Sequence, residues 1–229
     1  MIKSYGSEYF NKQKAVGHIA GLILSKNFSS HVRSGDCVID FGCGGGFLLS
    51  ALECGDRIGI EPNDVAAKVA IESGVSVFRS SKELLYLKGE SIADVIISNH
   101  ALEHCLRPFD ELQLIYRLLK PGGTVHFIVP CETTRVHFDP KNSDKHLYSW
   151  SPQNLGNLFT EIGFIVTRVG PKLSKFPPGY QMLWRYGRYI FGVISLVYGS
   201  VFRTWSSVEI IAKKEGDLAQ GGLPVELNF

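Results

Sequence analysis

Histidine and carboxylate side chains recur at short spacing in one stretch of the chain. His100, Glu103 and His104 stand at positions i, i+3 and i+4, and His146 follows in a later segment. If the first three residues begin a helix, this spacing places their side chains on one face. Imidazole nitrogens and a carboxylate in that arrangement can act as a general base or bind a divalent metal ion. A helix start whose polar groups satisfy nearby backbone is an equally good interpretation.

A glycine-rich stretch offers a second kind of chemistry. A short apolar run that contains Asp40 leads into Gly42, Gly44 and Gly46. Glycine tolerates positive φ and lets a ligand approach the backbone closely. Glu61 closes the next apolar run, where a carboxylate can accept hydrogen bonds from both hydroxyls of a ribose. These residues predict a site for a nucleotide-like ligand at the carboxyl end of a buried strand, before a helix that begins near residue 48.

The spacing of the glycines separates two classes of nucleotide-binding protein. It is G-x-G-x-G, with Phe47 where the dinucleotide fingerprint has glycine or alanine. An NAD(P)-dependent oxidoreductase that uses the same loop and Glu61 is therefore the less favoured alternative.

Alternating strands and helices must position these side chains. Apolar runs typical of strands buried on both faces occupy residues 37–41, 57–61, 75–79, 93–98 and 124–130. Helical periodicity covers 11–28, 109–120 and 152–162. Two more strands are expected near 164–172 and 206–213. The alternation predicts an α/β fold with a doubly wound, mostly parallel sheet, in which helix 11–28 is a lid or flank.

The segment 174–205 interrupts this alternation between the last two expected strands. It is rich in aromatic residues and contains no acidic residue. Its uncharged run, 189–202, is shorter than the roughly 20 residues that span a bilayer. The segment is interpreted as a hydrophobic cover over the sheet or the substrate, with a homodimer contact and peripheral membrane contact through 180–205 as alternatives. The tail 216–229 lacks periodicity and is expected to be flexible.

Composition restricts the possible partners and the compartment. The formal net charge is +2, with 24 basic and 22 acidic residues, which is not the charge balance of a protein that binds a nucleic-acid backbone. The five cysteines are odd in number and fall mostly in expected strands or beside the glycine stretch, as in a protein of a reducing compartment. No signal-peptide pattern opens the chain, so we expect a cytoplasmic protein with one domain over 1–215, with attachment to the inner face of the membrane as an alternative.

Four ordered motifs between residues 35 and 170 resemble the class I S-adenosylmethionine-dependent methyltransferases. They are Val38-Ile39-Asp40-Phe41-Gly42-Cys43-Gly44-Gly45-Gly46, Gly59-Ile60-Glu61-Pro62-Asn63, the stretch from Asp94 to His104, and Leu118-Leu119-Lys120-Pro121-Gly122-Gly123. The resemblance implies a Rossmann-like seven-stranded sheet with an antiparallel last strand.

The resemblance also implies which residues hold S-adenosylmethionine. Asp40 and the glycines would hold its methionine portion and Glu61 its ribose. Further contacts are expected from Cys43, Pro62, Ser80, Ser81, Asn99 and His100. The acid that the family often places after the third strand, against the adenine amino group, is absent here, where the chain reads Phe78-Arg79-Ser80-Ser81-Lys82.

A second resemblance concerns the histidines. The later segment with His146 resembles the histidine motif of small-RNA 2'-O-methyltransferases, whose metal site uses E-x-x-E-H plus a later histidine, and the ubiquinone-pathway O-methyltransferases share a similar stretch. His100 stands here in place of the first glutamate, so a metal site at His100, Glu103, His104 and His146 is not favoured. His100, His104 and His146 remain the candidate catalytic residues.

These observations lead to one expected function. The chain is expected to transfer a methyl group from S-adenosylmethionine to an oxygen of a small molecule, sugar or lipid-linked intermediate. Besides the oxidoreductase, a non-catalytic cofactor-binding module is the remaining alternative.

Overall fold

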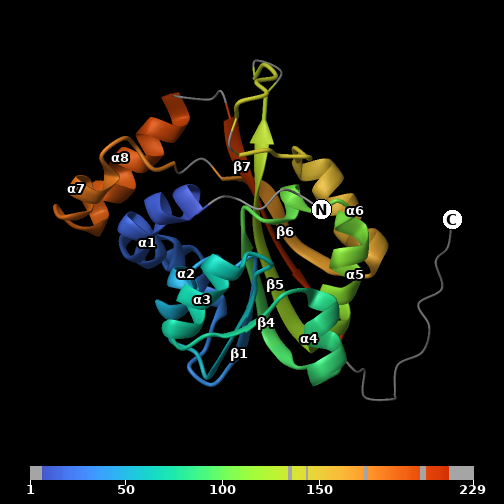
Figure 1. Cartoon of the computed structure of the whole chain (residues 1–229). Helices are drawn as coiled ribbons and strands as arrows, with labels where there is room; N and C mark the ends of the chain where they lie inside the picture. Colours follow the sequence, from blue (N-terminus) through green and yellow to red (C-terminus); the bar gives the residue numbers. More distant parts are fainter. Residues whose placement is uncertain (1–6, 134–135, 143, 173–174, 202–204, 217–229) are drawn as a thin grey trace, which may run out of the picture.

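Seven strands form one sheet in the order β3-β2-β1-β4-β5-β7-β6 (Figure 1). The computed structural model of the chain describes residues 7–133, 136–142, 144–172, 175–201 and 205–216. The strands are β1 Cys37–Phe41, β2 Asp56–Ile60, β3 Ser76–Phe78, β4 Ala93–Asn99, β5 Leu119–Glu132, β6 Ile165–Lys172 and β7 Trp205–Lys213. Strands β1 to β5 pair in parallel, and β7 runs antiparallel to both β5 and β6. The predicted seven-stranded, mostly parallel sheet is confirmed.

Helices cover both faces of this sheet. Their bounds are α1 Ser7–Phe28, α2 Phe47–Ser50, α3 Asp64–Glu72, α4 Ser81–Lys88, α5 Pro108–Leu118, α6 Pro152–Ile162, α7 Tyr180–Trp184 and α8 Arg188–Val201, with short 3-10 turns η1 Ser29–His31 and η2 Leu102–His104. Helices α1 to α3 pack Phe28, Leu49 and Ala70 into one core. Helices α4 to α6 pack Leu84, Ile115 and Phe159 into the other core, so the sheet is doubly wound as expected.

Local sequence signals explain where α6 begins and ends. The Ser151 hydroxyl accepts a hydrogen bond from the Asn154 backbone N–H, and the Asn154 side chain accepts one from the Ser151 N–H. This capping box satisfies two donors that a helix start leaves unpaired. Gly163 ends the helix in the left-handed conformation, with φ 108°.

The helix predicted over 109–120 ends earlier, at Leu118. Strand β5 begins at Leu119, so Pro121, Gly122 and Gly123 lie inside the strand segment. The reason is Pro121, because a proline disfavours the helical conformation of the residue before it. Lys120 is therefore extended, and its ammonium pairs with Asp94 of β4 at 2.8 Å.

The long segment between β6 and β7 contains α7 and α8, which stand on the same side of the sheet as α1, α2 and α3 in Figure 1. Residues 173–174 and 202–204 of this segment lie outside the described residues, as does the predicted flexible tail from residue 217 onward. Among the helices that are described, none has the length and apolar character needed to cross a membrane.

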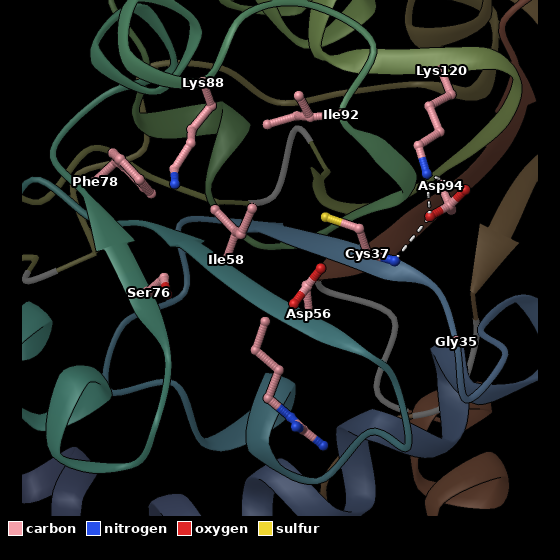
Figure 2. A pocket seen from close by; sticks show the side chains of 11 residues that line it. Gly35, Cys37, Asp56, Ile58, Ser76, Phe78, Lys88, Ile92, Asp94 and Lys120 are labelled. Atoms are coloured by element: carbon pink, nitrogen blue, oxygen red, sulfur yellow. Dashed lines mark hydrogen bonds and ion pairs between the residues drawn. The ribbon is translucent and has the colours of Figure 1, made fainter.

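A hollow of about 400 Å³ lies at the amino ends of the parallel strands. Figure 2 shows Cys37, Asp56 and Ser76, the first residues of β1, β2 and β3, around it, with the Lys120–Asp94 pair at its side. Ligands of doubly wound sheets bind at the opposite edge, beyond the carboxyl ends of the strands. We therefore build the candidate site at the carboxyl edge.

Candidate functional site

The glycine turn after β1 is shaped by positive φ angles. Gly42, Gly44 and Gly46 have φ of 79°, 52° and 74°. A Cβ atom on Gly42 would lie 2.3 Å from the Cβ of Ala101, so the turn packs directly against the segment that follows β4. The backbone N–H groups of Gly42 and Cys43 donate to the Ile60 carbonyl of β2 at 2.9 and 3.2 Å. The helix expected after the turn is reduced to the single turn of α2.

Glu61 lies beside this glycine turn. Its carboxylate accepts hydrogen bonds from the backbone N–H of Gly44 at 2.9 Å and of Asn63 at 2.8 Å. Burial raises the pKa of the carboxyl group, while the two backbone donors oppose the rise. Each carboxylate oxygen can accept more than one hydrogen bond, so Glu61 can hold the turn and still receive ribose hydroxyls.

Asp40 lies beneath the turn near the end of β1. The side chain is buried, and burial together with the neighbouring Glu61 charge raises its pKa to about 7. A cationic ligand group near Asp40 would favour the ionised form, because an opposite charge lowers the pKa of a carboxyl group.

The other predicted cofactor residues lie around the same edge. The Cys43 thiol is buried against Gly59, so this residue presents its backbone to the turn. Pro62 is exposed beside Glu61. The hydroxyls of Ser80 and Ser81 already have partners, since Ser80 accepts from the Glu83 N–H at the start of α4 and Ser81 donates to Glu111 at 2.9 Å.

The end of β4 connects the glycine turn to the histidines. The buried Ser98 hydroxyl donates to the Phe41 carbonyl of β1 at 2.8 Å. Asn99 is half-buried opposite Ile128 of β5. His100 follows in the left-handed conformation, with φ 56°, and its Nε2 lies 3.3 Å from the Ser207 hydroxyl of β7.

The stretch after β4 is not the α-helix that the i, i+3, i+4 spacing was taken to indicate. It forms the 3-10 turn η2, because His100 takes a left-handed conformation that an α-helix cannot contain, and α5 begins only at Pro108. The turn still gathers the predicted side chains. The carboxylate of Glu103 lies 3.4 Å from Nδ1 of His100 and 3.9 Å from Nε2 of His104.

His146 joins this cluster from the segment after β5. Its Nε2 lies 3.9 Å from the Glu103 carboxylate, and its ring centroid lies 5.2 Å from that of His104. The backbone N–H of Leu147 donates to the Glu103 carbonyl at 3.0 Å and fixes the two segments together. Burial lowers the pKa of His104, although the Glu103 charge opposes this.

Glu103 is the most unusual member of the cluster. Its side chain is fully buried, and neither carboxylate oxygen has a hydrogen-bond partner among the described residues. Ligand atoms of Glu103, His104 and His146 all lie within 4.8 Å of one another. A buried carboxylate is costly unless it is paired or coordinates a metal, so a positive group must balance it when the protein works.

Glu132, near the end of β5, is a site residue that the sequence analysis missed. Its carboxylate lies 2.8 Å from Nδ1 of His146. Because a carboxylate can only accept, Nδ1 is the donor, and Nε2 is the ring nitrogen that faces Glu103. The only sequence signal for Glu132 was its place just beyond the strand predicted at 124–130.

Comparisons with known proteins point in one direction. A family model described as a methyltransferase domain matches residues 17–169. A ubiquinone biosynthesis O-methyltransferase of Nitrosospira multiformis is 31% identical over 161 residues, which cover 61% of this chain and 67% of that protein. One of Colwellia psychrerythraea is 37% identical over 98 residues, which cover 39% of this chain and 40% of that protein.

The fold has similar relatives among solved structures. A SAM-dependent methyltransferase of Archaeoglobus fulgidus superposes with a TM-score of 0.63 at 21% identity, covering 90% of this chain and 99% of that protein. At this identity the likeness concerns the fold. The alignments with the two curated relatives span 40% and 67% of their lengths.

Proposed function

The chain belongs to the class I S-adenosylmethionine-dependent methyltransferase family, and from this premise we propose that it transfers the methyl group of S-adenosylmethionine to an oxygen atom of a small molecule, sugar or lipid-linked acceptor. No comparison supports the NAD(P)-dependent oxidoreductase. We place the reaction in the cytoplasm or at the inner face of its membrane, in keeping with the cysteine content.

One observation carries the cofactor half of the proposal. The Glu61 carboxylate is held against Gly44 and Asn63 at the carboxyl end of β2, next to a turn whose three glycines take positive φ. This arrangement suits a nucleoside, because the carboxylate can accept from ribose hydroxyls and the glycines leave the backbone open to the ligand. Asp40, buried under the turn, would face the ammonium group of the methionine portion.

The histidine cluster supports transfer to oxygen. Methyl transfer from a sulfonium is an in-line displacement with a good leaving group, so positioning provides much of the rate acceleration. A hydroxyl acceptor must also lose a proton. The Nε2 of His146 can accept it, because the hydrogen bond from Nδ1 to Glu132 fixes the tautomer and supports the imidazolium that results. The names of the curated relatives, both O-methyltransferases, favour an oxygen acceptor as well.

The same cluster also fits a divalent metal ion. Glu103, His104 and His146 would hold it, since the two oxygens of Glu103 accept no hydrogen bond among the described residues and Glu132 would orient His146 from behind. When bound, such an ion would polarise the acceptor hydroxyl and lower its pKa. His100 would border the site through its contact with Glu103 at 3.4 Å.

Calorimetric titration with S-adenosylhomocysteine tests the cofactor assignment. We expect submillimolar binding that Asp40→Ala and Glu61→Ala abolish and that Glu72→Ala, an exposed acid on α3, leaves unchanged. Unchanged binding in both site variants would reject the assignment. NADH, titrated in the same way, is expected not to bind.

Incubation with labelled S-adenosylmethionine and fractionated cell extract tests the transfer. Label is expected to enter a small-molecule, glycan or lipid pool, and the labelled product should carry the methyl group on oxygen, as an ether or ester, rather than on nitrogen. A chain that binds the cofactor and labels no fraction would favour the non-catalytic module.

Elemental analysis of protein purified without chelator tests the metal. Near-stoichiometric divalent metal is expected in the wild type and in His137→Ala, which alters an exposed loop histidine, but not in His104→Ala. Metal-free wild type after incubation with manganese, zinc or magnesium would rule out the metal and leave His146 as the base.

A further inference from the structure

Exposed apolar side chains are concentrated on α7, on α8 and on the turn between them. We call this set the outer apolar face; its members are Met182, Tyr186, Tyr189, Ile190, Val193, Leu196, Val197 and Val201. Along α8 they recur at the three- and four-residue spacing that places side chains on one side of a helix. Tyr189 is 76% exposed and Val193 64% exposed, so this side is not used to pack the helix onto the rest of the chain.

The opposite side of α8 supplies the packing. Phe191 is buried and its ring lies 5.4 Å from Trp184 of α7 and 5.9 Å from Phe176. The Lys175 backbone N–H donates to the Ser195 carbonyl at 3.2 Å and ties the exit of β6 to the helix. The helices α7 and α8 are therefore packed through their buried side chains, and the outer apolar face is left exposed.

The charged residues of the segment that contains α7 and α8 are all basic. No aspartate or glutamate stands between Glu161 and Glu209, whereas Lys175, Arg185, Arg188 and Arg203 lie in the α7–α8 segment. Arg185 is exposed at the end of α7, next to Tyr186 of the outer apolar face. Apolar side chains beside arginines, without acids, are the pattern of a helix that lies in the interface of an anionic membrane.

We propose that the outer apolar face docks this protein peripherally on an anionic phospholipid surface. The helix α8 has 14 residues, or about 21 Å, which is too short for the roughly 30 Å hydrocarbon core, so it would lie in the plane of the membrane. A second copy fits the face less well, because a two-fold dimer places a patch against itself and this segment offers basic residues but no acid to pair with them.

The placement of the segment connects docking to the reaction. The segment leaves the sheet after Lys172 and returns at Trp205, the first residue of β7, and Lys172 pairs with Ser207 of β7. The Ser207 hydroxyl touches His100 at 3.3 Å. Docking would therefore bring the acceptor end of the site to the lipid surface, which selects a lipid-linked or membrane-partitioned acceptor. This part rests on the proposed function.

Co-sedimentation of the full chain with vesicles tests the docking. Binding is expected to phosphatidylcholine vesicles that contain phosphatidylglycerol, and much less to phosphatidylcholine alone or at high salt. The double variant Val193→Asp/Val197→Asp should bind at least about tenfold more weakly, because each aspartate replaces a valine whose burial in the interface favours binding. Ile71→Asp, the same kind of change at an exposed position of α3, is the matched control and should bind as the wild type.

The outcomes separate docking from catalysis. S-adenosylhomocysteine affinity, measured for every variant, should not change, so a failure to bind the cofactor would count against the proposed function and not against the docking. Equal vesicle binding by the wild type and the double variant would overturn the proposal. The proposal would also be overturned if the wild type did not bind vesicles and formed a dimer, and the double variant were a monomer. The outer apolar face would then be a contact between two copies of the chain.

Discussion

The two halves of the sheet's carboxyl edge, one at β1 and β2 and the other at β4 and β5, are built by different means. At β1 and β2 the contacts come from the backbone, with three glycines in positive φ and a carboxylate that fastens the turn. At β4 and β5 they come from side chains, gathered from η2, β5 and the segment after β5 around the buried Glu103. A site made of backbone is built when the fold forms, whereas a site made of charged side chains stays incomplete until a ligand or ion balances it.

Removing the Glu61 carboxylate should cause the largest change at the cofactor half. Glu61→Ala loses the hydrogen bonds to Gly44 and Asn63 as well as those to the ribose. Because hydrogen bonds to a charged group are worth about 1.5–3 kcal/mol each, we expect at least about 100-fold weaker binding of S-adenosylhomocysteine in calorimetry. Binding within a few-fold of the wild type would mean that the glycine turn alone holds the nucleoside.

Neutralising Glu103 should separate activity from stability. Glu103→Met keeps the volume but removes a buried charge that lacks hydrogen bonds, so we expect methyl transfer to fall about 100-fold while cofactor affinity stays the same. In urea denaturation of metal-free protein the free energy of unfolding should stay equal or rise by about 1 kcal/mol. A loss of several kcal/mol would show that the ion pairs of Glu103 with the histidines maintain the fold.

Lowering the pH should weaken binding of the cofactor through protonation of Asp40. Its pKa in the free protein is raised to about 7, so the carboxyl group is largely protonated below that pH and ionised above it. The ammonium group of the cofactor favours the ionised form, so affinity should rise with pH and fall about tenfold from pH 8 to pH 6. Titration of Asp40→Asn over the same range should give a flat, weaker profile, and a flat wild-type profile would contradict the role of Asp40.

Removing the hydrogen bond that joins β4 to β1 should have the smallest effect. Ser98→Ala removes the hydrogen bond from β4 to the Phe41 carbonyl of β1 and leaves that buried acceptor without this donor. We expect a loss of about 1 kcal/mol in the free energy of unfolding, measured with urea. Ser73→Ala, which removes a similar bond at the exposed end of α3, should cost less and serves as the control.

The sequence predicted the glycine turn at β1 and β2 better than the side-chain cluster at β4 and β5, because the turn depends on local conformation. Positive φ and strand burial are local requirements, so Gly42, Gly44 and Gly46 could be recognised from their neighbours in the chain. The seven-stranded sheet with an antiparallel last strand followed from the family resemblance and is confirmed.

The side-chain cluster depends on contacts that local patterns do not contain. Glu132 meets His146 because β5 extends to residue 132 before the chain returns, which the apolar run 124–130 did not reveal. The prediction of a helix directly after β4 was wrong for a related reason, since His100 takes a left-handed conformation where the helix was expected to begin. Whether the predicted residues bind cofactor or metal stays a prediction for the experiments above.

The hairpin-like exit from the sheet has an evolutionary consequence. Since the chain leaves β6 after Lys172 and enters the neighbouring strand β7 at Trp205, the chain between them can be lengthened, shortened or exchanged without altering the order of the strands. Grafting the corresponding segment of another enzyme at these two positions would give a chimera that keeps the glycine turn and Glu61 and changes only the chain between β6 and β7. A change of substrate during evolution would then require the exchange of this one segment and no change in the strands that carry the candidate site.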